Sequence, residues 1–142
     1  MNQNVEPVTK SSSAGKFKWV AAVFFVLLAI VAVKNLPRGF SDDLSGIGKG
    51  KAAVVLIRDK NAVQTFDLLE LMNGLRDQYA EKVDFLLTDF NTPQGKKFMQ
   101  ANEAPRVTLV LLDAAGKKVK VLFPPQTTES LQQEVAALQA AP

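Results

Sequence analysis

The sequence contains no cysteine and no histidine among its 142 residues. Without cysteine it has no disulfides, no thiolate nucleophile, no iron–sulfur ligands and no cysteine zinc site. Without histidine it lacks the usual zinc ligand and the usual general base at neutral pH. These two absences exclude most familiar catalytic and metal chemistry, so we expect a protein that is not an enzyme and that holds neither a cofactor nor a metal.

Two acidic pairs are the remaining candidates for a cation site. Asp42 with Asp43, and Asp84 with Asp89, offer the carboxylates that hard cations prefer. Neither pair has the ligand number or the glycine placement of a calcium loop. We therefore expect solvated surface charges at these positions.

Positive charge is concentrated near the N-terminus. Residues 1–40 contain five Lys or Arg and one Glu, whereas residues 41–142 contain twelve Lys or Arg and thirteen Asp or Glu. The resulting net charges of +4 and −1 account for the formal charge of +3 for the whole chain. A polyanion-binding domain would itself carry the basic surplus, so nucleic acid is not an expected partner.

An uninterrupted apolar run, WVAAVFFVLLAIVAV, covers residues 19–33 between Lys18 and Lys34. At about 1.5 Å per residue it spans about 22 Å as a helix, which is less than the roughly 30 Å hydrocarbon core of a bilayer. Phe17 and Leu36 extend the apolar segment, and the flanking lysines reach the headgroup region with their charged ends. We predict a transmembrane signal anchor over residues 17–36, with the lipid bilayer as its partner.

Two other interpretations of this run stay open. A cleaved signal peptide has an apolar region of similar length, although Ile30 stands two residues before the only suitable cleavage point, after Ala32. A buried helix of a soluble protein is the third possibility. Basic residues on both sides of the run leave the positive-inside count undecided, whereas the usual plan of a signal anchor places the C-terminal domain outside the cytoplasm.

The rest of the chain divides into a tail, a linker and one domain. Residues 1–16 include the segment SSSAG and lack apolar periodicity, which predicts a disordered tail. Residues 37–50 contain Pro37 and four glycines, which predicts a linker. The remaining residues, 51–142, then form a single small domain.

Apolar patterns in the domain predict strands over residues 52–57, 83–89, 107–113 and 119–123. Helices are predicted over 62–80, over 94–102 with Pro93 near the first turn, and after the capping residues Thr127 and Thr128. The side chains expected to face inward are Val63, Phe66, Leu69, Met72, Leu75 or Arg76, and Tyr79 in the first helix, and Leu131, Val135 and Leu138 in the last. The order β-α-β-α-β-β-α predicts an α/β layered fold.

This order of elements and two sequence segments resemble the thioredoxin fold family. The segment LRDQYAEKVDFLLTDFNTP at 75–93 is similar to the end of the family's first helix, its second strand and the following turn with proline. The segment VTLVLLDAAGKKV at 107–119 is similar to the third strand, turn glycine and fourth strand of membrane-tethered bacterial members. The resemblance implies a thioredoxin-like domain behind a single N-terminal transmembrane helix.

The residues that this family uses for redox chemistry are replaced. Residues 62–65, AVQT, occupy the positions of the family's Cys-x-x-Cys motif, so thiol–disulfide exchange has neither an attacking nor a resolving thiol. Leu56 stands at the position of the family's buried acidic residue, and Val107 at that of its cis-proline. Because a cis bond before a non-proline residue costs about 3 kcal/mol, we expect a trans bond before Val107 and a rearranged loop.

The loop after the first strand, RDKN at 58–61, lies where α/β folds commonly bind ligands. An ordinary polar loop, in which Asp59 or Asn61 caps the following helix, is the simpler explanation of its composition. The functional hypothesis is a partner-binding surface, because the resemblance implies that this loop meets the loops containing Pro105 and Arg106 and containing Pro124 and Pro125. The predicted binding residues are Asp59, Lys60, Asn61, Val63, Gln64, Pro105, Arg106 and Val107.

These observations lead to one main hypothesis and two alternatives. The main hypothesis is a membrane-anchored, redox-inactive thioredoxin-like module that binds membrane or periplasmic proteins at a bacterial inner membrane. One alternative is an accessory component of cytochrome or disulfide biogenesis that works with a partner's cysteines. The other is a structural subunit of a membrane complex, whose single span is its important part.

Overall fold

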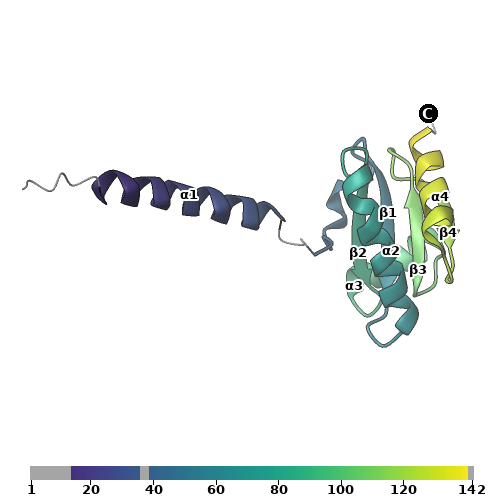
Figure 1. Ribbon diagram of the computed structural model, residues 1–142. Helices are drawn as coiled ribbons and strands as arrows, with labels where there is room; N and C mark the ends of the chain where they lie inside the picture. Colours follow the sequence, from purple (N-terminus) through teal and green to yellow (C-terminus); the bar gives the residue numbers. More distant parts are fainter. Residues whose placement is uncertain (1–13, 36–38, 141–142) are drawn as a thin grey trace, which may run out of the picture. The chain divides into compact units, whose positions relative to one another are not determined.

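The computed structural model describes residues 14–35 and 39–140. The chain separates into two compact units, residues 1–39 and residues 40–142, and each is described by itself. The first unit contains helix α1, Ala14–Asn35 (Figure 1). Of the tail predicted over 1–16, residues 1–13 lie outside the described residues. Residues 14–16 form the start of α1, where they continue the backbone bonds of the apolar run.

Helix α1 is long and apolar enough to cross a membrane. Its segment Gly15–Val33 has 19 residues and a mean hydropathy of 2.2, and none of it is buried. A helix satisfies its backbone hydrogen bonds internally, which the interior of a bilayer requires. By length and composition, the helix predicted over 17–36 is therefore a candidate membrane span.

The second unit contains a four-stranded sheet with the order β2-β1-β3-β4. The strands are β1 Ala52–Arg58, β2 Val83–Asp89, β3 Thr108–Leu112 and β4 Lys118–Leu122. Strands β1 and β2 are parallel, whereas β3 is antiparallel to both of its neighbours. The helices are α2 Val63–Tyr79, α3 Pro93–Asn102 and α4 Thr128–Ala140. The predicted β-α-β-α-β-β-α order is confirmed.

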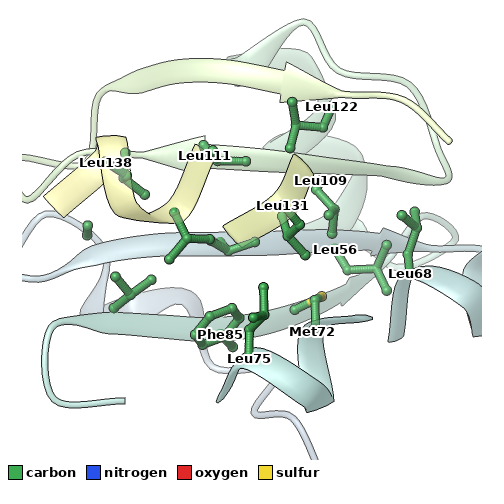
Figure 2. Packing of buried hydrophobic residues seen from close by; sticks show 14 of the residues in the cluster. Leu56, Leu68, Met72, Leu75, Phe85, Leu109, Leu111, Leu122, Leu131 and Leu138 are labelled. Carbon is green, nitrogen blue, oxygen red and sulfur yellow. The ribbon is translucent and has the colours of Figure 1, made fainter. Parts of the chain in front are cut away.

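Apolar side chains cover both faces of the sheet, as the continuous apolar run of β1 predicts. Successive side chains of a strand point to opposite faces. Val54 and Leu56 therefore pack against α2 and α4, and Val55 and Ile57 lie in the cluster on the face of α3. Figure 2 shows the first of these clusters, in which Leu56 lies among side chains of α2 and α4. The domain thus has three layers, with the central strand buried on both sides.

Helix α2 buries only part of the predicted stripe: Met72 and Leu75 are buried as predicted, but two predicted residues near the start of the helix face solvent. The predicted residues Val63 and Phe66 are 72% and 60% exposed. Apolar residues occur on several sides of this helix, so their spacing alone does not select the buried face. A contact at its first turn helps to set the rotation, because the N–H of Asp59 donates to the buried hydroxyl of Thr65 at 3.3 Å. The buried residues of α2 are Thr65, Leu68, Met72 and Leu75, and those of α4 are the predicted Leu131, Val135 and Leu138.

Residues 40–50, which belong to the linker predicted over 37–50, pack onto the domain. Phe40 and Leu44 contact its apolar clusters. The N–H of Leu87 donates to the carbonyl of Ser41 at 2.9 Å, which adds a parallel bridge beside β2. Gly48 has φ +80 and approaches the turn between β3 and β4 so closely that a Cβ would lie 3.0 Å from a backbone oxygen. Glycine at position 48 therefore permits close packing against this turn. Because residues 40–50 pack in this way, the domain begins earlier than expected.

Candidate binding surface at the carboxyl ends of the strands

The candidate surface lies at the edge of the sheet where β1 and β2 end and β3 begins. Arg58 and Asp89, the last residues of the two parallel strands, are partners in register. Antiparallel pairing places Thr108, the first residue of β3, opposite Ile57. The loops at 59–62, 90–92 and 105–107 therefore leave the sheet at neighbouring points.

An ion pair joins the two loops that carry most of the predicted binding residues. Nη1 of Arg106 lies 3.3 Å from Oδ2 of Asp59, whose side chain is only 9% exposed. The guanidinium carbon of Arg106 also lies 5.3 Å from the ring centroid of Phe90. The N–H of Asn61 donates to Oδ1 of Asp59 at 3.0 Å. Because burial of an unpaired charge is costly, these partners hold Asp59 in place and tie the loops into one surface.

Asp89 forms ion pairs with two other cationic side chains at this edge of the sheet. Its Oδ2 lies 2.6 Å from Nη2 of Arg58 and 3.3 Å from Nζ of Lys60. The hydrogen bond from Arg58 is the main cause that holds the pKa of Asp89 below its ordinary value of 3.8, and Lys60 adds to this against the opposing effect of burial. From the sequence Asp89 is a candidate only for a cation site. The parallel alignment of β1 and β2 is the signal that would place it beside Arg58.

A hollow of about 290 Å³ opens beside these ion pairs. In the part of the chain that the structure describes, no group of three His, Cys, Asp or Glu side chains is placed to hold a metal ion. Both carboxylates of the hollow are engaged by cations of the chain. The residues that line it are Asp59, Lys60, Asn61, Asp89, Asn91 and Thr92.

The start of α2 carries no activated nucleophile. Its N-cap, Ala62, makes no side-chain hydrogen bond, so the prediction that Asp59 or Asn61 caps the helix is wrong. The carboxylate of Asp59 instead binds Arg106 and the N–H of Asn61 within its own loop. The hydroxyl of Thr65 accepts a hydrogen bond from the N–H of Asp59, and no hydrogen bond joins it to a side-chain base among the residues that the structure describes. A hydroxyl without a base is not a competent nucleophile.

Val107 has an unusual backbone conformation. Its φ of 61° lies in the left-handed region, which costs about 1–3 kcal/mol for a residue with a branched Cβ. Its N–H donates to the carbonyl of Ile57 at 2.8 Å and so holds the loop on β1. Among the described residues the only cis peptide bond joins Pro124 and Pro125, so the bond before Val107 is trans, as expected. The loop before β3 therefore combines a trans bond with a left-handed residue at Val107.

The third predicted loop lies beside the first turns of α2. Pro124 and Pro125 line, together with Gln64, a hollow of about 390 Å³. The side chain of Val63 is exposed on the same turn as Gln64. The structure thus gathers the predicted residues at one end of the domain, with Asp59 buried and Val107 half-buried. Phe66 is exposed near them and was missed, because its helical spacing predicts burial.

No family model and no curated protein sequence matches this chain. Its structure is similar to that of an uncharacterised thioredoxin-like protein from Clostridium perfringens, with a TM-score of 0.58 and 13% sequence identity over 63% of this chain and 72% of that one. It is also similar to a mutant thioredoxin from Halobacterium salinarum NRC-1, with a TM-score of 0.57 and 16% identity over 69% and 81% of the two chains. At these identities the likeness establishes the fold alone. The domain has a thioredoxin-like fold, and its chain contains no cysteine.

Proposed function

We propose that this chain is a membrane-anchored, redox-inactive thioredoxin-like module that binds a partner protein without a covalent step. The binding surface consists of the loops at 59–64 and 105–107. Helix α1 anchors the module in a bacterial inner membrane, and the domain lies in the periplasm. The partner is another membrane or periplasmic protein.

The observation that carries this proposal is that tertiary contacts fix the loops at 59–64 and 105–107, although these loops contain no cysteine for thiol chemistry. The ion pair between Asp59 and Arg106 and the hydrogen bond from Val107 to Ile57 hold two loops in fixed positions. Val107 is kept in a costly backbone conformation, and such strain is commonly found at binding and catalytic sites. Loops on a rigid scaffold are where proteins commonly place recognition residues.

Two exposed apolar side chains of α2 support protein binding over small-molecule catalysis. Val63 and Phe66 lie one helical turn apart on α2 and are mostly exposed. Exposed aromatic and aliphatic side chains beside charged loops are typical of an interface core with a polar rim. Arg106, which is 60% exposed and stacked near Phe90, belongs to a residue type enriched at interaction hot spots.

Extraction of the chain at native levels in a mild detergent tests the proposal. We expect a second protein to co-purify with the wild-type chain and to be lost from a Val63→Glu variant. Val63 is 72% exposed, so a charge there leaves the core intact. Asn73→Glu is the matched control, because it places the same charge on an exposed part of the same helix. A chain that purifies alone, or equal loss in both variants, would contradict the proposal.

The apolar surface of α1 favours a second candidate, in which the span itself assembles with a membrane complex. Replacement of residues 15–33 by an unrelated span of equal length separates the two candidates. A complex that survives this exchange favours the domain surface. Loss of the complex, with the domain still folded, favours the span.

A further inference from the structure

A continuous groove runs along α2 next to the loop between β4 and α4. One hollow of about 390 Å³ contains Gln64 and Pro124, and a second of the same volume contains Gly74. The two hollows share Asp67, Leu71 and Gln126, so they form one groove. Helix α2 packs on α4 behind it.

The floor of the groove is apolar and its wall is fixed. Leu68 is buried, Leu71 and Pro124 are half-buried, and all three line the groove. On the opposite side, the amide of Gln126 donates to the carbonyl of Phe123 at 2.6 Å and accepts from a serine hydroxyl of α4 at 2.9 Å. A preformed wall of this kind lowers the cost of ordering the site when a ligand binds.

The rim of the groove is acidic. Asp67 and Glu70 are exposed on consecutive turns of α2, and no Lys or Arg lines either hollow. Neither residue takes part in the ion pairs found among the described residues. The two acids of the surface at the ends of the strands, Asp59 and Asp89, are by contrast both paired. The groove therefore offers two uncompensated negative charges above an apolar floor.

Gly74 is a second feature of the groove, because it lines one end and places no side chain there. Glycine inside a helix costs about 1 kcal/mol relative to alanine. A Cβ at Gly74 would meet no atom within 4 Å, so close packing does not require glycine at this position. A side chain there would project at the end of the groove, which Gly74 lines. The missing side chain keeps that end clear.

We infer that this groove binds an extended, cationic segment of a partner protein. From Gln64 to Gly74 the helix rises about 15 Å, which matches about five residues of extended chain. Asp67 and Glu70 lie one turn apart, about 5–6 Å between their Cβ atoms. Side chains two residues apart in an extended segment point the same way at a similar spacing, about 6.6 Å. A segment with Lys or Arg at alternate positions and leucine-like residues between them fits the rim and the floor together.

This inference rests on the proposed function in that the occupant is a protein. The groove shares Gln64 with the loop surface at 59–64, and its other lining residues lie outside the loops at 59–64 and 105–107. A labelled peptide of sequence Gly-Lys-Leu-Lys-Leu-Gly is the probe, and its counterpart with Glu in place of Lys is the control. Binding to the full chain in a neutral detergent is measured by fluorescence anisotropy. We expect the Lys peptide to bind at least tenfold more tightly than the Glu peptide, with an affinity that falls as salt is added.

Two matched pairs of variants locate the binding. Asp67→Asn with Glu70→Gln should weaken the Lys peptide at least tenfold. Asp77→Asn with Glu81→Gln makes the same change in charge outside the groove and should alter binding less than twofold. Gly74→Leu should block the groove and weaken binding at least tenfold. Asn73→Leu, which places the same leucine at the neighbouring exposed position, should not.

Equal effects within either pair of variants, or equal binding of the two peptides, would overturn the inference. Co-purification separates it from the proposed function. If Asp67→Asn with Glu70→Gln keeps the native partner while Val63→Glu loses it, the loop surface stands and the groove is not the partner site. If the peptide results hold while Val63→Glu keeps its partner, the groove stands and the loop surface fails.

Discussion

Two neighbouring surfaces of this domain differ in whether their acidic side chains form ion pairs. At the ends of the strands, Asp59 and Asp89 are each held by cations of the chain, at 3.3 Å and 2.6 Å. Along α2, Asp67 and Glu70 stand exposed over an apolar floor and take part in none of the ion pairs of the described residues. In the first arrangement the carboxylates bind cations of the chain and fix the loops in position. In the second the carboxylates are free to attract cationic groups of a partner.

This contrast predicts that Asp59→Ala has the largest effect on stability. It removes a buried carboxylate that accepts a hydrogen bond from Asn61 and pairs with Arg106, so we expect a loss of about 2 kcal/mol in the free energy of unfolding. Asp67→Ala, which removes an exposed carboxylate, should change the same quantity by less than about 0.5 kcal/mol. Urea denaturation of the full chain in mild detergent, followed by circular dichroism, measures both. Similar costs for the two variants would remove the contrast between the surfaces.

Asp89→Asn should cost about 1–2 kcal/mol at neutral pH, because it weakens the charged hydrogen bonds to Arg58 and Lys60. The pKa of Asp89 is lower in the folded state than its ordinary value of 3.8. Its ionised form therefore stabilises the fold above that value, and this contribution is lost as the pH falls through the folded-state pKa. Denaturation curves of wild type and variant should converge as the pH falls below the folded-state pKa of Asp89. A difference that persists unchanged in acid would show that the ion pairs are not its source.

The strained loop can be compared with an ordinary strand position. Val107 and Val121 are both half-buried, but only Val107 has a positive φ. Glycine relieves the strain at the first position and loses packing at both. We expect Val107→Gly to cost about 1–2 kcal/mol less than Val121→Gly in the free energy of unfolding. Equal costs would mean that the loop at 105–107 stores no strain.

The last comparison concerns the glycine that lines the groove. Gly74→Ala adds a methyl group into open space on α2 and should stabilise the domain by about 0.5–1 kcal/mol. The midpoint of thermal unfolding, measured on the full chain, reports the change. A destabilised variant would indicate that the helix needs glycine for packing, and the groove argument would lose its support from this residue.

Most of the fold could be predicted from the sequence, because each element has a clear local pattern. The run at 52–57 is apolar at every position, and 83–89 is bounded by turn residues, so both strands are found where expected. The buried face of α2 could be predicted only in part: Met72 and Leu75 are buried as expected, whereas Val63 and Phe66 are exposed. Its apolar residues point in several directions, and the contact of Thr65 with the end of β1 is a tertiary one.

The candidate site could be located but not assembled from the sequence. Parallel pairing of β1 and β2 and antiparallel pairing of β3 bring 59–61 and 105–107 together, which the order of elements already implies. The partners of the charges could not be predicted, since Asp59 and Arg106 are 47 residues apart in the sequence. Nor does the sequence suggest that α2 and the β4–α4 loop border an acidic groove.

By itself, the sequence determined the layered α/β domain, the apolar N-terminal helix and the absence of thiol chemistry, because strand burial, helix length and residue chemistry are local properties. Only the tertiary structure decided which acids are paired, which face of α2 is buried and how residues 40–50 join the domain. These depend on side chains that meet across the fold, at distances that no local pattern encodes. The same long-range packing leaves Asp67 and Glu70 exposed, whereas Asp59 and Asp89 are held by cations of the chain.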